Sequence, residues 1–189
     1  MTHRHHANRR RFLRLGTAAA SGVALPMLAL PARASAASTA ERRLSLVHTH
    51  TGERVSLAYA VGERFVPESL SRLDRFLRDH YSGEVGRIDP HLFDLLHRVQ
   101  QATGRGDDAS FEIVSGYRCP ATNDRLRRTG GGGVARHSLH MEGRALDIRL
   151  PGVALDDLRD AAKSLRAGGV GFYAREQFVH VDTGRVRTW

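Results

Sequence analysis

The sequence predicts a single α+β domain in which a small antiparallel sheet packs against helices. Segments with alternating apolar and polar residues and segments with apolar residues at helical spacing occur mostly in separate runs, which is typical of this class. The length of 189 residues suits one domain, and no period of 20 to 50 residues repeats. A solenoid is therefore not expected.

The first 36 residues predict an export signal. Asn8–Arg14 resembles the twin-arginine pattern, in which paired arginines precede Phe-Leu and a further basic residue. An apolar stretch follows at Leu15–Leu30, and small residues at Ala32–Ala34 or at Ala34–Ala36 offer a cleavage site. A membrane anchor is the rival interpretation, but the short apolar length and Pro26 argue against a stable span. We expect a periplasmic protein without a lasting membrane anchor.

Composition narrows the classes of function. The net charge is +9, and six of these charges are arginines of residues 1–36, which contain no acidic residue. The remaining excess of three positive charges has no basic block interleaved with aromatic residues, so a nucleic-acid partner is not expected. The single Cys119 permits no internal disulfide. The expected organisation is a signal peptide at 1–36, a flexible lead-in at 37–43 and a monomeric domain at 44–189.

The mature chain opens with a predicted hairpin. Residues 44–48 and 55–59 alternate between apolar and polar types around a short turn that contains Gly52. His48 and His50 form an H-x-H pair, which can bind a metal ion from one strand face. No carboxylate nearby completes such a site, so two solvent-facing histidines near a turn are the favoured interpretation.

Helices are expected next in the order of the chain, at residues 67–79, 89–103, 120–128 and 155–166. Pro67 suits the first turn of its helix, and Asp89 and Pro90 suit the N-cap and first helical positions of the second. Gly168 and Gly169 are expected to end the last helix. The histidines of the second helix, His91 and His97, are expected at the surface because they are six residues apart.

The remaining strands are predicted at residues 111–115, 144–148, 170–173 and 178–182. Asp147 and His180 each lie between two aliphatic residues of their strand. If the two strands are neighbours with their aliphatic faces on a helical layer, Asp147 and His180 emerge together on the other face. His140, in the loop before the first of these strands, can reach the same face. Two histidines and a carboxylate form a ligand set typical of zinc.

The pattern Ser138-x-His140-x-x-Gly143-x-Ala145-x-Asp147, followed by His180, resembles zinc peptidases of the D-alanyl-D-alanine carboxypeptidase class. That class shares its core with lysostaphin-type endopeptidases and the hedgehog domain. The closer resemblance is to the periplasmic murein endopeptidase branch, and it spans Leu44–Trp189. The segments that carry it are Ser115–Arg118 with Asn123, Leu139–Met141, Gly168–Tyr173 and Phe178–Trp189.

The resemblance implies zinc held by His140, Asp147 and His180, with water in the fourth position. It also implies that Arg118 steadies the substrate or the developing oxyanion, a role that suits a permanently charged guanidinium. The expected activity is zinc-dependent hydrolysis of peptide cross-links between peptidoglycan stem peptides. One alternative is a catalytically silent hedgehog-like zinc domain that binds wall peptides or a partner. Another is a carboxypeptidase that trims terminal D-alanine.

The proton acceptor departs from the family pattern. Related enzymes place a glutamate three residues, or a histidine two residues, before the last histidine ligand, and here these positions are Gln177 and Phe178. Three other residues are candidates. Asp182 is preferred over Glu176 because it shares a strand face with the last ligand, where it could take the proton or orient that ligand. His137 is the third candidate.

Overall fold

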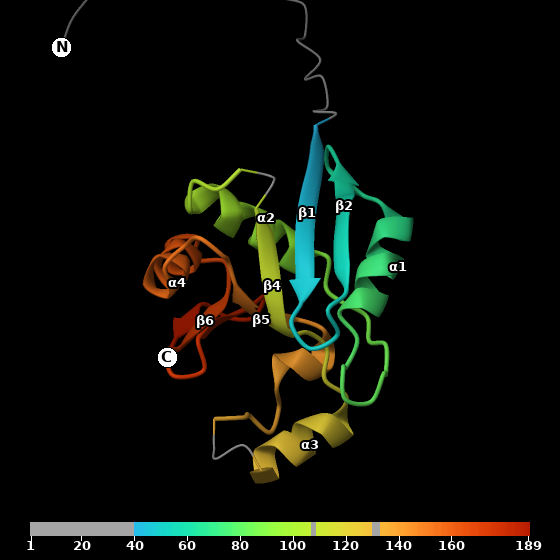
Figure 1. Ribbon diagram of the computed structural model, residues 1–189, viewed down its shortest axis with the longest axis vertical. Coiled ribbons are helices and arrows are strands. Elements are labelled where there is room, and N and C mark those ends of the chain that lie inside the picture. The colour runs from blue at the N-terminus through green and yellow to red at the C-terminus, as the bar shows by residue number, and fades with distance from the viewer. Residues whose placement is uncertain (1–39, 107–108, 130–132) are drawn as a thin grey trace, which may run out of the picture. The chain divides into compact units, whose positions relative to one another are not determined.

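An eight-stranded sheet with the order β3-β2-β1-β4-β5-β7-β6-β8 forms the framework of the computed structural model (Figure 1). The structure describes residues 40–106, 109–129 and 133–189, so the expected signal peptide at 1–36 lies outside the described residues. The strands are β1 (Glu41–His48), β2 (Arg54–Val61), β3 (Arg64–Phe65), β4 (Ser110–Ser115), β5 (Ala145–Arg149), β6 (Gly169–Tyr173), β7 (Phe178–Asp182) and β8 (Arg187–Thr188). The helices are α1 (Pro67–Phe76), α2 (His91–Ala102), α3 (Pro120–Thr129), the 3₁₀ helix η1 (Leu139–Glu142) and α4 (Leu155–Ser164).

The α+β class is confirmed. The sheet is larger than the expected small antiparallel one, and it contains parallel as well as antiparallel pairings. Five of its seven strand pairings are antiparallel, whereas β1 pairs with β4 and β6 pairs with β8 in parallel. Parallel neighbours need a long connection, and the segment between β1 and β4, which contains α1 and α2, supplies one. Alternation within a strand does not reveal the direction of its partner, which is why the sequence did not predict these pairings.

The hydrophobic core lies between the sheet and a helical layer. Helices α2 and α4 contact each other, and they pack on β1 and on β6 and β7, respectively. The aliphatic residues that flank Asp147 and His180 belong to this core, as the alternation predicted. The core members from these two strands are Leu146, Ile148, Val179 and Val181. The polar residues between them therefore emerge on the opposite face of the sheet.

The expected lead-in at 37–43 overlaps the first strand. β1 begins at Glu41, before the expected domain start at residue 44. Arg42 forms an ion pair with Asp94 of α2, and its guanidinium also donates to the carbonyl of Gly62. These contacts order a strand end that is too polar to show alternation in the sequence.

Two helix ends differ from the sequence prediction. α1 stops at Phe76 rather than Asp79, because the Asp79 carboxylate accepts the backbone N–H groups of Tyr81, Ser82 and Cys119 and so holds a loop. α4 stops at Ser164, and Arg166 rather than a glycine adopts the left-handed backbone, with φ of 47°.

The start of α2 lies near the expected position. The helix begins at His91 with Pro90 as its cap residue, whereas Asp89 was expected as the N-cap. The Asp89 side chain nevertheless accepts the His91 N–H at 3.0 Å, which satisfies one of the free donors at this end. Among the described residues, no helix is long and apolar enough to span a bilayer.

Candidate metal centre

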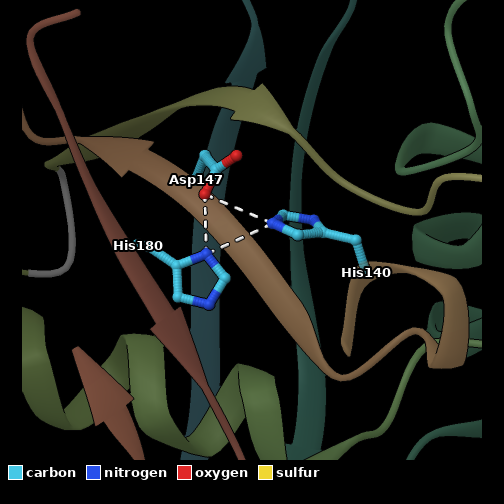
Figure 2. Close-up of side chains that lie close together, drawn as sticks. All are labelled: His140, Asp147 and His180. Carbon is cyan, nitrogen blue, oxygen red and sulfur yellow. Dashed lines mark hydrogen bonds and ion pairs between the residues drawn. The ribbon is translucent and has the colours of Figure 1, made fainter. Parts of the chain in front are cut away.

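Three buried side chains from separate elements meet on the face of the sheet that is opposite the helical layer (Figure 2). His140 lies on η1, Asp147 on β5 and His180 on β7. β5 and β7 pair in antiparallel register with Asp147 directly opposite His180, so the condition on which the alternation argument rested, that the two strands are neighbours, is met. The three side chains are almost inaccessible, with exposed fractions of 1%, 3% and 8%.

The residues around His140 explain the spacing of the sequence motif. The Ser138 hydroxyl accepts the His140 N–H and caps η1. Gly143 ends this helix in the left-handed conformation with φ of 66°. A side chain at Gly143 would overlap the carbonyl of Arg87, so only glycine fits between the histidine and the following strand.

The three facing atoms form a triangle that fits a tetrahedral metal ion. His140 Nε2 lies 3.3 Å from Asp147 Oδ1 and 3.2 Å from His180 Nδ1, and the third side, Asp147 Oδ1 to His180 Nδ1, is 2.8 Å. Bonds of about 2.0–2.1 Å to zinc imply ligand–ligand distances of about 3.3 Å in a tetrahedron. Two sides therefore match this geometry, and the third is a hydrogen-bond length.

The tautomer of His140 is set by its neighbours. Its Nδ1 lies 2.7 Å from the Gly116 carbonyl, which can only accept, so Nδ1 carries the proton. Its Nε2 lies 3.1 Å from Arg118 Nη2, which can only donate, so Nε2 presents a lone pair. His140 therefore directs a lone pair, not a proton, into the centre of the triangle.

His180 is oriented by Asp182. The Asp182 carboxylate accepts from His180 Nε2 at 3.2 Å, so the other nitrogen, Nδ1, faces the triangle. Asp182 is itself fixed, because it accepts both Nη groups of Arg187 and the backbone N–H groups of Gly169 and Gly184. A carboxylate that holds a ligating histidine in this way is a common feature of metal sites.

Burial and charge act together on these groups. Burial lowers the pKa of His140, so its ring is neutral and suited to bind a metal. Burial opposes ionisation of Asp147 and Asp182, but the adjacent histidines, and for Asp182 also Arg187, hold the pKa of each carboxyl well below its usual range. Burial also works against a charged His180, yet its hydrogen bonds to both carboxylates raise its pKa. Both carboxylates are therefore ionised, and their negative charge favours a cation at His180, either a proton or a metal ion.

Arg118 lies at the edge of the triangle. Its Nη2 contacts both His140 and the Oδ2 atom of Asp147, and its Nε donates to the Ser115 hydroxyl at 2.9 Å. The side chain also lines a cavity of about 400 Å³ that opens over the three buried groups. Arg118 thus places a permanent positive charge beside the three groups, on the wall of the cavity that they share.

The three candidate proton acceptors have different surroundings. Asp182 is fully buried and both of its oxygens already accept hydrogen bonds, which fits orientation of His180 rather than proton transfer. Glu176 and His137 are exposed and line the cavity. Gln177, at the usual glutamate position, has a left-handed backbone with φ of 58°, and its side chain bonds back to Ala174. Glu176, one residue earlier, lines the cavity, whereas Gln177 does not.

His48 was expected to face solvent, and this is wrong. Its side chain is fully buried, while His50 is exposed, and both lie beside His80. The sequence did not reveal His80 as their neighbour, because it lies 30 residues beyond His50, in the loop after α1. Within the described ranges, His140, Asp147 and His180 are the only group of histidine, cysteine and acidic residues placed to hold a metal ion.

The sequence also missed several residues that shape the centre. They are Gly116, which fixes His140 through its carbonyl, and Arg187, Tyr173 and Trp189, which line the cavity. The glycines at 169 and 171, separated by one residue within a strand, were the available signal, because glycine inside a strand marks a close approach of neighbouring groups.

Comparison with known proteins identifies close relatives. The chain matches the family described as peptidoglycan L,D-endopeptidase MepK over residues 36–189. It is 42% identical to the peptidoglycan L,D-endopeptidase MepK of Escherichia coli K12 over 183 residues, and the alignment covers 97% of each chain. The identity and the coverage are the same for the peptidoglycan L,D-endopeptidase MepK of Shigella flexneri. The probable peptidoglycan L,D-endopeptidase MepK of Haemophilus influenzae is 39% identical over 184 residues, with 96% of this chain and 95% of that protein covered. No solved structure matches the chain.

Proposed function

This chain belongs to the peptidoglycan L,D-endopeptidase MepK family, and on that basis we propose that it is a zinc-dependent murein endopeptidase. Its substrates are the peptide cross-links between peptidoglycan stem peptides. The observation that carries the zinc dependence is the convergence of three acceptor atoms within 2.8–3.3 Å of one another, each on a side chain that is almost fully buried.

We propose that zinc is held by His140 Nε2, Asp147 Oδ1 and His180 Nδ1. The donor set of two imidazoles and one carboxylate is typical of catalytic zinc sites with one open position. When bound, the ion supplies Lewis-acid polarisation of the scissile carbonyl and activates water at neutral pH. The Gly116 carbonyl and the Asp182 carboxylate keep the two imidazole lone pairs directed at the site.

Arg118 acts on the substrate carbonyl. As the scissile bond is attacked, negative charge develops on the carbonyl oxygen, and a donor already in place stabilises it without reorganisation. The Arg118 guanidinium is permanently charged, and its Nε is fixed by the Ser115 hydroxyl. Its Nη2 contact with Asp147 keeps it at the edge of the metal centre, on the cavity side.

Glu176 is the proposed proton acceptor, and Asp182 is the residue that orients His180. Glu176 lines the same cavity as the three ligands and is exposed, so its carboxylate is open to water in that cavity, as a proton acceptor must be. His137 lines the same cavity and is the competing acceptor. Glu176→Gln should lower kcat by about 100-fold or more without loss of zinc, whereas a comparable loss for His137→Gln alone would reassign the role.

The test of the function uses the purified protein and cross-linked muropeptide dimers. We expect about one bound zinc per chain by mass spectrometry of the metal content, release of monomers in liquid chromatography, loss of release with a chelator and recovery with zinc. His140→Ala should lose both zinc and activity. Dimers that stay intact with zinc bound would contradict the enzyme and favour the silent zinc domain.

The carboxypeptidase alternative is distinguished by product mass. An endopeptidase converts a dimer into two monomers, whereas a carboxypeptidase removes single alanine residues and leaves the cross-link intact. The family description and the named relatives are endopeptidases, so neither alternative is favoured.

Action on peptidoglycan implies an exported or periplasmic protein, and we propose the twin-arginine route. The support is the Asn8–Arg14 pattern followed by apolar and small residues. Replacement of both Arg9 and Arg10 by lysine should leave an unprocessed precursor in the cytoplasm. Normal export of that variant, measured by cell fractionation, would assign a different route.

A further inference from the structure

We propose that Trp189 determines substrate affinity by packing its indole against the cross-linked stem peptide. This inference rests on the endopeptidase function proposed above and adds a specificity-determining residue to it. In the sequence, Trp189 is the last residue of a segment that carries the family resemblance. The structure places its side chain on the wall of the cavity that opens over the metal centre.

Two glycines of β6 make this placement possible. Gly169 and Gly171 lie on one face of the strand, and Gly171 is paired with His180 of β7. A β-carbon at Gly171 would lie 2.7–2.8 Å from three atoms of the Trp189 indole, and one at Gly169 would overlap the Arg187 guanidinium. Because neither residue has a side chain, the side chains of Arg187 and Trp189 can cross β6 toward the metal centre.

The indole is held in a fixed orientation. The Trp189 backbone bonds to Val170 and Phe172 of β6, and the indole Nε1 donates to the Tyr173 hydroxyl at 3.0 Å. The Arg187 guanidinium lies 4.8 Å from the indole centroid. A side chain ordered before binding loses little conformational entropy when the substrate arrives, which favours affinity.

The indole is also exposed where a ligand would lie. Trp189 is 50% exposed although its backbone is paired in the sheet. It lines the cavity together with Tyr173 and Phe178, whose rings stack at 4.5 Å. An ordered aromatic wall in a cavity beside polar groups is typical of a binding surface. Stem peptides with short side chains present amide planes and methyl groups, which pack well on aromatic faces.

The role of Trp189 differs from that of Arg187. The Arg187 guanidinium donates hydrogen bonds to both oxygens of Asp182, and that carboxylate in turn orients the His180 ring. The indole centroid lies 5.3 Å from the His180 ring, in contact range but without a hydrogen bond to any of the three proposed ligands. Loss of the indole should therefore weaken substrate binding and leave the metal in place.

The first experiment measures steady-state cleavage of purified cross-linked muropeptide dimers. Trp189→Ala should raise KM about tenfold with kcat changed less than threefold and bound zinc unchanged, and Trp189→Phe should give an intermediate KM. Gly171→Ala, which displaces the indole, should also raise KM. Val186→Ala is the matched control, because Val186 is 51% exposed in the same segment and is not among the residues that line the cavity. This control should leave both constants unchanged.

The second experiment uses fluorescence. Trp189 is the only tryptophan in the chain, so the intrinsic emission reports directly on this wall. With zinc chelated to stop turnover, added dimers should shift or quench the emission of the full-length protein. The same titration followed by calorimetry gives an independent measure of binding.

The outcomes separate this inference from the proposed function. Unchanged KM for Trp189→Ala, or a fall in kcat and zinc content at constant KM, would overturn the role of the indole while the endopeptidase activity stands. Binding by calorimetry with unaltered emission would also overturn it. Absence of both turnover and binding in the unmodified protein would overturn the proposed function and this inference with it.

Discussion

Two groups of three side chains bring histidine rings close together in the described part of this molecule, but only one of them is arranged to hold a metal ion. In the candidate metal centre, called the metal centre below, the rings of His140 and His180 are 5.0 Å apart at an angle of 64°, with Asp147 between them. In the second group, which we call the histidine cluster, His48, His50 and His80 have ring distances of 4.1–6.0 Å. The ring distances in the two groups are therefore similar, although only the first group is placed to hold a metal ion among the described residues.

The direction of the nitrogen atoms separates the two groups. In the histidine cluster, His50 and His80 stack with planes 4° apart, so their nitrogens do not converge on one point. His48 Nδ1 accepts the His50 N–H, which leaves a proton on Nε2, and this atom has no hydrogen-bond partner among the described residues. The metal centre instead directs lone pairs inward. Convergence, a carboxylate and fixed tautomers, rather than proximity, define a candidate metal site.

The largest expected effect concerns the carboxylate of the metal centre. Asp147→Asn should abolish zinc binding and lower kcat/KM at least about 1000-fold, because the site loses the charge that balances the ion. Metal analysis and muropeptide cleavage measure both. His80→Gln is the control from the histidine cluster and should keep zinc and activity. Zinc retained by Asp147→Asn would remove the carboxylate from the ligand set.

A smaller effect is expected from the residue that orients a ligand. Asp182→Asn should weaken zinc affinity by about 10–100-fold, because the His180 ring loses its charged partner and its preferred tautomer. Competition with a chromogenic chelator measures this affinity. Ser138→Ala is a useful comparison, since it disturbs η1 without contacting a ligand side chain. Equal zinc affinity in Asp182→Asn and the unmodified protein would contradict the orienting role.

The histidine cluster should make the free energy of unfolding depend on pH, and it should not bind a metal ion. Burial and the neighbouring histidines lower the pKa of His80 to about 4, below the unfolded value of 6.5, and burial also lowers that of His48. The unfolded chain therefore binds more protons between pH 6.5 and 4, and the free energy of unfolding should fall as pH falls through this range. For His80, we expect a loss of about 1–2 kcal/mol after allowance for partial exposure.

Chemical denaturation of chelated protein at pH 7 and pH 4.5 measures this loss. The same change in the free energy of unfolding is measured for the His80→Gln variant and subtracted from that of the unmodified protein. The contribution of the metal centre is common to the two proteins and cancels. The variant should show a shallower dependence on pH. Identical dependence in the two proteins would show that His80 titrates at its ordinary value.

The smallest effect is expected for the exposed member of the histidine cluster. His50→Ala removes one ring of a stack that solvent already reaches, so the free energy of unfolding should change by about 0.5 kcal/mol or less. Zinc content should be unchanged. Thermal and chemical denaturation measure the first quantity, and a loss of zinc would link the two groups that the geometry separates.

The sequence by itself determined much of the metal centre. Alternation of apolar and polar residues placed Asp147 and His180 each on the non-aliphatic face of its strand, since side chains point to opposite faces at every second residue. That the two strands are neighbours came from the structure. The left-handed turn at Gly143 and the cap at Ser138 are also local features of the segment around His140, whereas the overlap with Arg87 that restricts position 143 to glycine is a tertiary contact. Local periodicity and turn chemistry are properties of short segments, so they can be predicted from residue types.

Only the tertiary structure decided which distant groups complete the site. Gly116 fixes the tautomer of His140, Arg187 fixes Asp182, and Trp189 reaches the cavity across two glycines. The parallel pairing of β6 with β8 and the meeting of His80 with His48 were equally hidden. These contacts join segments whose separation in the chain carries no periodic signal, because they depend on how the elements pack together.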